Sequence, residues 1–192
     1  MQKIGLFFGS FNPVHTGHLV IAQAMVDHTE LDKVWFVVSP QNPFKPAKSL
    51  LHEFDRFDMV SAAIADNPKL GLTDVEFHLP RPSYTIDTLH HLRSKHPDKE
   101  FSLILGEDNL EGFPRWKESD RILSNHRLFV YPRPNAADSP LRHHDHVVMV
   151  PAPMMDISAT WIRQAVRDRK SIRYLVPDAV AEIIDRKGFY LS

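Results

Sequence analysis

Short apolar runs alternate along the chain with stretches in which apolar residues recur every three or four positions. The runs at 3–8 and 33–38 predict buried strands, and the periodic stretch at 18–26 between them predicts a helix. The apolar side of that helix carries Leu19, Ala22, Met25 and Val26. Strand, helix and strand in this order are typical of a βαβ unit, in which the two strands are parallel.

The same alternation continues through the rest of the chain. It predicts helices over 53–65, 84–95, 116–123, 159–167 and 178–186, and strands over 70–77, 101–105, 127–131 and 147–150. This order indicates a Rossmann-like α/β fold, with an open, mostly parallel sheet and helices on both faces. Ligands of such sheets bind beyond the carboxyl ends of the strands, so a functional site is expected in the loops after Phe8, Val38 and Leu105.

Size and composition narrow the class of protein. The 192 residues, 43% of them hydrophobic, fit one domain over 1–192 with a continuous core. Lys and Arg total 23 against 24 Asp and Glu, so there is no broad basic field for a nucleic-acid partner. No apolar run reaches the ~20 residues of a membrane span and the apolar start is too short for a signal peptide, so we expect a cytoplasmic protein. The absence of cysteine excludes disulfides, thiolate nucleophiles and thiolate zinc sites.

The first candidate site is the segment 9–18, which joins the first strand to the first helix. Its small residues let backbone N–H groups approach an anion, and the helix start adds partial positive charge. His15 and His18 can donate hydrogen bonds to phosphate oxygens as negative charge develops there. The alternative is a structural turn with Thr16 as the helix cap and two surface histidines, but the position after a first strand favours phosphate binding.

A second candidate lies at 156–163, again at a predicted helix start. The hydroxyls of Ser158 and Thr160 can cap that helix and contact an anion, while Arg163 can reach back over the same end as a planar fork for phosphate. Taken alone, such a segment is more often a structural N-cap followed by a basic helix.

Both segments resemble signatures of the nucleotidyltransferase superfamily. The first reads Phe8-Gly9-Ser10-Phe11-Asn12-Pro13-Val14-His15-Thr16-Gly17-His18 where the superfamily usually has G-G-S-F-D-P-x-H-x-G-H, so Phe8 and Asn12 depart from the pattern. The second resembles I-S-S-T-x-I-R, with Ala159 at the second serine. The resemblance implies catalytic roles for His15, His18 and Arg163, and an ATP site completed by the C-terminal helices from about 158 to 192. The implied ATP-binding residues are Gly9, Ser10, Phe11, His15, His18, Lys45, Ser158, Thr160 and Arg163.

Further segments, at 83–88, 106–110, 114–117 and 174–177, resemble the bacterial nicotinate-nucleotide adenylyltransferases, so the likeness covers essentially the whole chain. It implies that Trp116 stacks on a pyridine ring, that Thr85 and the amides around Trp116 and Lys117 hold its carboxylate, and that Asp108 lies near a ribose. Tyr84 is assigned to the same substrate site. An indole face independently suits an aromatic ligand. A core anchor of its helix is the alternative role for Trp116.

The resemblance implies transfer of AMP from ATP to nicotinate mononucleotide in NAD synthesis, with Mg²⁺ held mainly by the ATP phosphates. The alternatives are another acceptor, such as nicotinamide mononucleotide or phosphopantetheine, or a module that senses nucleotides without chemistry. The oligomeric state is open, and a homo-oligomer is compatible with the sequence.

Three other features receive structural interpretations. For Lys45, a solvated loop lysine is as good an interpretation as a triphosphate contact. Arg56 is expected in an amphipathic helix, where it orients the adjoining loop. The histidines at 143, 144 and 146 are expected in a solvated loop rather than a metal site, because their spacing fits no helical ligand pair.

Overall fold

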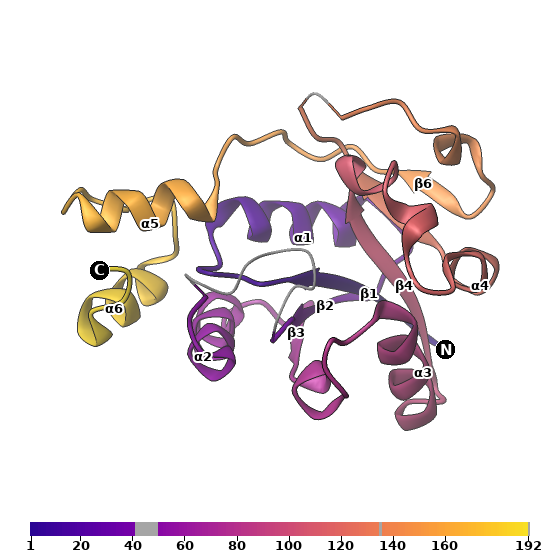
Figure 1. Ribbon diagram of the computed structural model, residues 1–192, viewed down its shortest axis with the longest axis horizontal. Coiled ribbons are helices and arrows are strands. Elements are labelled where there is room, and N and C mark those ends of the chain that lie inside the picture. Colours follow the sequence, from indigo (N-terminus) through magenta and orange to yellow (C-terminus); the bar gives the residue numbers. More distant parts are fainter. Residues whose placement is uncertain (41–49, 135, 192) are drawn as a thin grey trace.

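Six parallel strands form the centre of the molecule (Figure 1). The computed structural model describes residues 1–40, 50–134 and 136–191. The strands are β1 (Gln2–Gly9), β2 (Lys33–Val38), β3 (Leu70–Thr73), β4 (Lys99–Gly106), β5 (Leu128–Tyr131) and β6 (Val147–Met149). Their order in the sheet is β3-β2-β1-β4-β5-β6, and every neighbouring pair is parallel. The predicted Rossmann-like α/β fold is therefore confirmed, and the order of the strands reverses between β1 and β4.

The helices connect successive strands and then close the chain. They are α1 (Thr16–His28), α2 (Glu53–Ile64), α3 (Thr85–Lys95), α4 (Ser119–Asn125), α5 (Ala159–Arg167) and α6 (Asp178–Lys187). Short 3-10 turns lie at η2 (Val75–His78), η3 (Glu107–Asn109), η4 (Phe113–Arg115) and η5 (Pro140–His143).

Two hydrophobic clusters cover the two faces of the sheet. Successive residues of a strand point to opposite faces, and accordingly Leu6 and Phe7 belong to different clusters, as do Leu103 and Ile104. Helices α1, α2, α5 and α6 contribute to one cluster, whereas α3 and α4 contribute to the other. Because both faces are covered, the strands are almost continuously apolar, which is why short apolar runs located them in the sequence.

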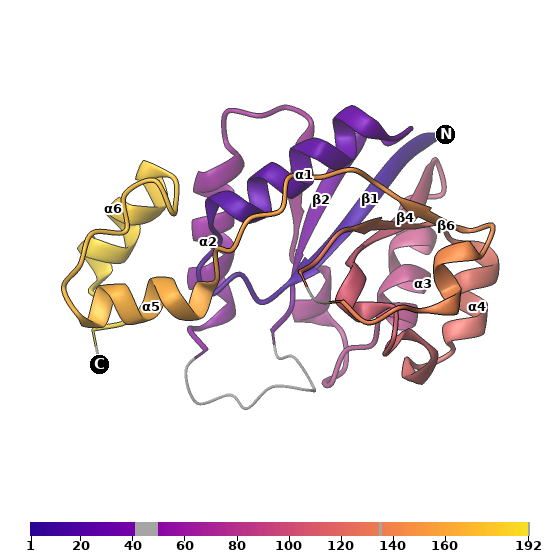
Figure 2. The same ribbon diagram turned by 90° about the horizontal axis from the view of Figure 1, so that it is seen from above.

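The C-terminal helices return to the start of the chain. After β6 an extended segment runs along α1 to α5 and α6, which lie at the opposite end of the molecule from β6 (Figures 1 and 2). Backbone hydrogen bonds connect this part to the first helix, since the Thr16 N–H donates to the Leu175 carbonyl oxygen at 2.8 Å. Residues near both ends of the sequence therefore lie side by side.

Most predicted elements differ from the structure by one or two residues at an end, and two differ by more. The strand expected over 70–77 ends at Thr73, whose hydroxyl accepts from the Val75 N–H at 3.2 Å and starts the η2 turn. The helix expected over 116–123 begins only at Ser119. Trp116 has an extended ψ of 148° and Glu118 a left-handed φ of 53°, and neither conformation continues a helix.

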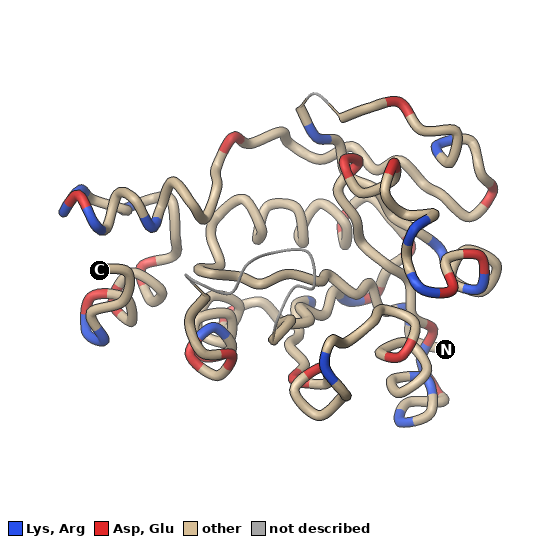
Figure 3. Tube along the Cα trace, in the orientation of Figure 1, with Lys and Arg blue, Asp and Glu red and all other residues tan. Residues whose placement is uncertain are grey.

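The surface agrees with the balanced composition. Basic and acidic residues are interspersed along the trace rather than gathered on one element (Figure 3). Within the described ranges, no helix combines the length and apolar character that crossing a bilayer requires.

Candidate active site

A buried arginine of α2 holds the loop after β1 in place. Arg56 of α2 is 0% exposed, and its Nη1 donates to the carbonyl oxygens of Ser10 at 2.6 Å and Ser39 at 2.8 Å. Its other nitrogens reach the carbonyl oxygens of Pro40 at 3.1 Å and Leu51 at 2.9 Å. Arg56 was expected to orient the loop that carries Lys45, and it does bind the two described residues at the start of that loop, Ser39 and Pro40. The guanidinium also links the loops that follow two neighbouring strands.

The two histidines stack at the start of α1. Their ring centroids lie 3.7 Å apart and the planes differ by 26°. The backbone N–H of His15 donates to Nδ1 of His18 at 3.2 Å, so a neutral His18 carries its proton on Nε2. The alternative of a Thr16 cap is wrong, because His15 is the N-cap residue and the Thr16 hydroxyl donates to the Tyr174 carbonyl oxygen at 3.0 Å. His15 is 6% exposed and is not a surface residue.

Electrostatics keep both rings neutral at physiological pH. Burial, aided by the positive charge of Arg133, lowers the pKa of His15 to about 4. Burial also lowers the pKa of His18, with smaller contributions from His15 and Arg133. Neutral imidazoles can stack closely without repulsion and still offer N–H donors to an anion.

The second motif meets this loop across the fold. Ser158 accepts a hydrogen bond from the Trp161 N–H at 3.2 Å and caps α5, as predicted. Thr160 does not cap the helix, because its hydroxyl accepts from Arg163 Nη2 at 3.2 Å. Nη1 of Arg163 donates to the Asn12 carbonyl oxygen at 2.8 Å, although 151 positions separate the two residues. The structure therefore brings the two motifs together.

A pocket of about 270 Å³ lies between the carboxyl ends of β1 and β4. Its lining includes Gly9 and Ser10 together with Tyr84, Thr85, Trp116 and Lys117. This is the reversal point of the strand order, where open parallel sheets bind ligands. Two of the residues predicted to bind ATP and four of those predicted to bind the acceptor thus line one cavity. The two histidines, the second motif and Asp108 are not among its lining residues. Lys45 lies outside the described residues.

Trp116 closes the η4 turn instead of standing on a helix. The centre of its indole ring lies 5.2 Å from the centre of the Phe113 ring. Trp116 is partly exposed and lines the pocket. The neighbouring Lys117 binds the Asp87 carboxylate at 2.9 Å, and its ammonium lies 4.9 Å from the Tyr84 ring centre. The core-anchor alternative is wrong about the helix, but Trp116 does pack against the hydrophobic cluster that α3 and α4 share. Because its partly exposed indole also lines the pocket, a ligand can reach it there.

The histidines at 143, 144 and 146 lie in and after the η5 turn. His143 and His144 are exposed, whereas Nδ1 of His146 lies 2.7 Å from the Leu123 carbonyl oxygen. Among the residues described, no group of three or more His, Asp or Glu is placed to hold a metal ion.

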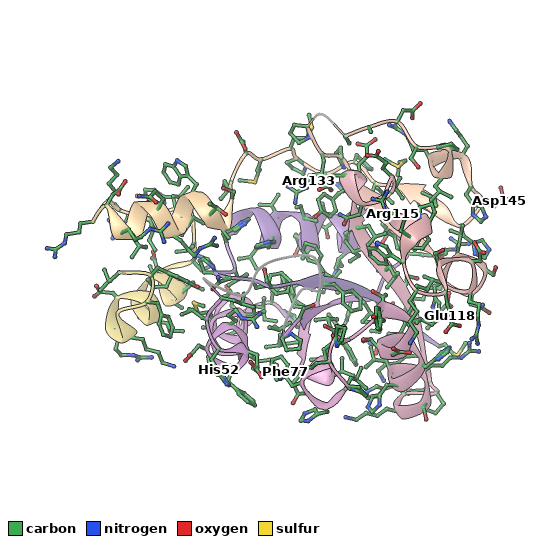
Figure 4. The ribbon with its side chains drawn as sticks, viewed as in Figure 1. His52, Phe77, Arg115, Glu118, Arg133 and Asp145 are labelled. Carbon is green, nitrogen blue, oxygen red and sulfur yellow. The ribbon has the colours of Figure 1, made fainter. Side chains whose placement is uncertain are left out.

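Sequence reasoning missed Glu76 and Arg133. Glu76 is 3% exposed, lines the pocket and accepts from the Thr88 hydroxyl at 2.9 Å, and burial raises its pKa. Arg133 follows β5, and its Nε lies 3.8 Å from Oδ1 of Asp108 (Figure 4). Two signals were available: a carboxylate between Val75 and Phe77, and an arginine two positions beyond a predicted strand.

Comparisons with known proteins agree with this geometry. Residues 6–165 match the cytidylyltransferase-like family. A probable nicotinate-nucleotide adenylyltransferase of Cytophaga hutchinsonii is 58% identical over 98% of both chains, and one of Flavobacterium psychrophilum is 46% identical over 98% of this chain and 99% of its own length. A solved Plasmodium falciparum nicotinic acid mononucleotide adenylyltransferase complexed with NaAD has the same fold, with a TM-score of 0.82 at 19% identity over 99% of this chain and 98% of its own. The chain therefore belongs to the nicotinate-nucleotide adenylyltransferase family of cytidylyltransferase-like proteins.

Proposed function

We propose that the protein transfers AMP from ATP to nicotinate mononucleotide, forming nicotinate adenine dinucleotide and releasing pyrophosphate. One observation carries the proposal: a single pocket joins the end of β1, which leads into the histidine loop, to the segments of Thr85 and Trp116. Two nucleotides bound on the two sides would meet beside His15 and His18. Holding two reactants in such a geometry can itself supply much of a rate enhancement.

The chemistry requires no covalent enzyme intermediate. A 5'-phosphate oxygen of the acceptor attacks the ATP α-phosphorus in line, a new P–O bond forms, and the bond to the bridging oxygen breaks with its electron pair leaving on pyrophosphate. Because the attacking phosphate is already an anion, no general base is needed. The work of the protein is positioning and charge stabilisation.

His15, His18 and Arg163 are proposed to stabilise the developing charge. Since Nδ1 of His18 accepts a backbone hydrogen bond, its Nε2–H is left to donate to phosphate. Arg163 adds a planar fork suited to phosphate oxygens. Gly9, Ser10, Phe11, Ser158 and Thr160 are proposed to complete the ATP site.

The C-terminal helices are proposed to belong to the same ATP site within one domain. The support is that Arg163 and Tyr190 both bind Asn12, through its carbonyl oxygen at 2.8 Å and its side-chain Oδ1 at 2.8 Å. Asn12 lies in the loop that carries the histidines, so this end of the chain fixes the loop from one side. A cytoplasmic location is part of the same proposal.

Mg²⁺ is proposed as the metal, held mainly through the ATP phosphates, where it would neutralise phosphate charge. Mg²⁺ keeps several water ligands and needs only one or two carboxylates. Asp108 fits this requirement, because its side chain is 59% exposed just beyond β4. The same residue is proposed to lie near a ribose.

The acid is proposed as the preferred acceptor over the amide. Thr85 opens α3, whose first N–H groups and partial positive charge lie at the pocket. Backbone N–H groups donate to a carboxylate but cannot accept from the N–H groups of a carboxamide. With Trp116 stacked on the pyridine ring and the amides near Lys117 contributing, the carboxylate would be bound by charge-assisted hydrogen bonds.

The test is a panel of acceptors with ATP and Mg²⁺, scored by pyrophosphate release. We expect nicotinate mononucleotide to exceed nicotinamide mononucleotide in kcat/KM by at least ~10-fold, the effect of one charge-assisted hydrogen bond. Phosphopantetheine should give no product. Equal values for acid and amide would contradict the acceptor assignment, and a lack of pyrophosphate with every acceptor would favour a nucleotide-sensing module.

A further inference from the structure

Positive charge is scarce around the histidine loop in the described part of the chain. Both imidazoles are neutral at physiological pH, as shown above. Arg163 is the cation already assigned to phosphate, and each of its Nη atoms also donates to a neutral protein oxygen, of Asn12 or Thr160, whereas Lys117 is bound to Asp87. Two nucleotides bring several phosphate charges, so a further cation beside the loop would have a clear task.

Arg133 is such a cation and has donors to spare. Its guanidinium carbon lies 5.1 Å from the centre of the Tyr131 ring, and Nη2 donates to the Tyr131 hydroxyl at 3.3 Å. Nε is buried and makes no hydrogen bond in the described structure, because the Asp108 carboxylate is 3.8 Å away. The arginine side chain is nevertheless 37% exposed, so solvent or a ligand can reach it.

Arg133 is connected to the histidine loop through two packed aromatic rings. Tyr131, on which it stacks, lines the pocket and packs edge-on against Phe7, with ring centres 6.0 Å apart. Phe7 in turn lies 6.0 Å from the His18 ring. In Figure 4, Arg133 lies near the carboxyl end of β4, where the order of the strands reverses.

The backbone around Arg133 is built to hold it there. The Glu107 carboxylate accepts from the Arg133 N–H at 3.4 Å and also binds the guanidinium of Arg142. Gly106 leaves room for the side chain, since a Cβ at that position would lie 3.2 Å from Arg133 Nε and 2.4 Å from Asp108 Oδ1. Glycine at this position therefore permits the close approach of the guanidinium to the end of β4.

We propose that Arg133 binds phosphate oxygens of one of the two substrates, beside His15 and His18. This inference rests on the proposed function and adds a phosphate-binding residue to it. The loose contact with Asp108 gives the guanidinium a partner before the ligand arrives, and a phosphate can replace that partner through two parallel N–H donors. Asp108 is then released toward a ribose hydroxyl.

The experiment measures binding rather than turnover, so its outcome does not depend on whether the transfer reaction takes place. ATP and nicotinate mononucleotide are each titrated calorimetrically into wild type, Arg133→Gln, Arg133→Lys and Arg142→Gln. Arg142→Gln is the matched control, because it removes the other guanidinium held by Glu107 and leaves Arg133 in place. Thermal unfolding of each variant checks that it is folded.

We expect Arg133→Gln to weaken the binding of one nucleotide by about 10- to 100-fold, as loss of a charge-assisted hydrogen bond does. Weaker ATP binding would place Arg133 on the triphosphate, and weaker mononucleotide binding would place it on the acceptor phosphate. Arg133→Lys should bind that nucleotide with an affinity between those of wild type and Arg133→Gln. If Arg133→Gln does not fold, the affinity of the lysine variant tests the proposal instead. Affinities within threefold of wild type for both nucleotides, or an equal loss in Arg142→Gln, would overturn the proposal.

Discussion

A single backbone hydrogen bond fixes both the orientation and the tautomer of the His18 ring. Its Nδ1 accepts from the His15 backbone, its ring packs 5.0 Å from that of Phe11, and burial holds it neutral. These contacts leave one N–H donor in a rigid position, which is the preorganised arrangement that stabilises charge in a transition state.

Replacement of His18 by alanine should therefore lower kcat by ~10²- to 10³-fold, the typical cost of one preorganised donor, while the fold survives. The control is His28→Ala, which removes the same side chain from the exposed end of the same helix. Steady-state kinetics and circular dichroism of both variants check the expectation. A folded His18→Ala enzyme with kcat near that of wild type would contradict the catalytic assignment.

The lowered pKa values of the histidine pair predict a dependence of stability on pH. In the unfolded chain an imidazole binds its proton near pH 6.5, but folded His15 does so only near pH 4. Between these values the unfolded state binds more protons, so stability should fall as the pH is lowered from about 6.5 to 4. Imidazole NMR spectra should show both rings neutral at pH 6, with the His18 proton on Nε2. Titration of either ring at pH 6.5 would contradict the burial argument.

At the level of elements, the loops after β1 and β2 are bound to α2 through one side chain. Arg56 satisfies four carbonyl oxygens with donors in a single plane. Lysine keeps the charge but has no planar fork, so it cannot reach the same set. A conservative replacement at this position should therefore be costly.

Arg56→Lys is expected to lower the free energy of unfolding by at least ~2 kcal/mol, since each buried polar group left unpaired costs ~1–3 kcal/mol. Denaturant unfolding measures this, with Arg93→Lys on the exposed side of α3 as the control. Because Arg56 also holds the carbonyl oxygen of Ser10, the loss of this bond should displace the loop after β1. Activity should therefore fall even at temperatures where the variant is still folded. Equal stability of the two lysine variants would contradict the anchoring role.

The elements differ in how far sequence could place them. Buried strands such as β1 and β2 are continuous apolar runs, so their type and bounds follow from the pattern alone. The start of α4 does not, because Glu118 adopts a left-handed conformation that nothing in its chemistry demands. For that reason Trp116 was expected on the wrong element, although it does line the pocket.

The same limit applies to the candidate site. Motif spacing located His15, His18 and Arg163, and the strand-end rule located the pocket. Arg133 and Glu76 needed three-dimensional information, because their importance lies in contacts with Tyr131 and Thr88 that adjoin the pocket. A lone charged residue after a strand is usually solvated, and only the fold shows otherwise.

At the scale of the whole molecule, the C-terminal end is fastened to the first loop. Helix α6 packs on α2, Lys187 binds Asp55 at 2.6 Å, and the Tyr190 hydroxyl donates to Asn12 Oδ1 at 2.8 Å. Both Tyr190 and Asn12 are buried. Because Asn12 also receives Arg163, the position of α5 over the loop depends on contacts made almost at the end of the chain.

Tyr190→Phe should expose this dependence, because it removes one oxygen and preserves the ring. Asn12 Oδ1 keeps the longer contact from the Leu51 N–H at 3.4 Å, so we expect a loss of about 1–2 kcal/mol in unfolding free energy and a several-fold rise in the KM for ATP, with kcat little changed. Tyr174→Phe is the matched control: Tyr174 is 83% exposed and binds Thr16 only through its backbone carbonyl. Denaturant unfolding measures the change in stability of both variants, and steady-state kinetics measure their KM for ATP and their kcat. If Tyr190→Phe lowers stability but leaves the KM for ATP at the wild-type value, the C-terminal helices stabilise the fold without shaping the ATP site.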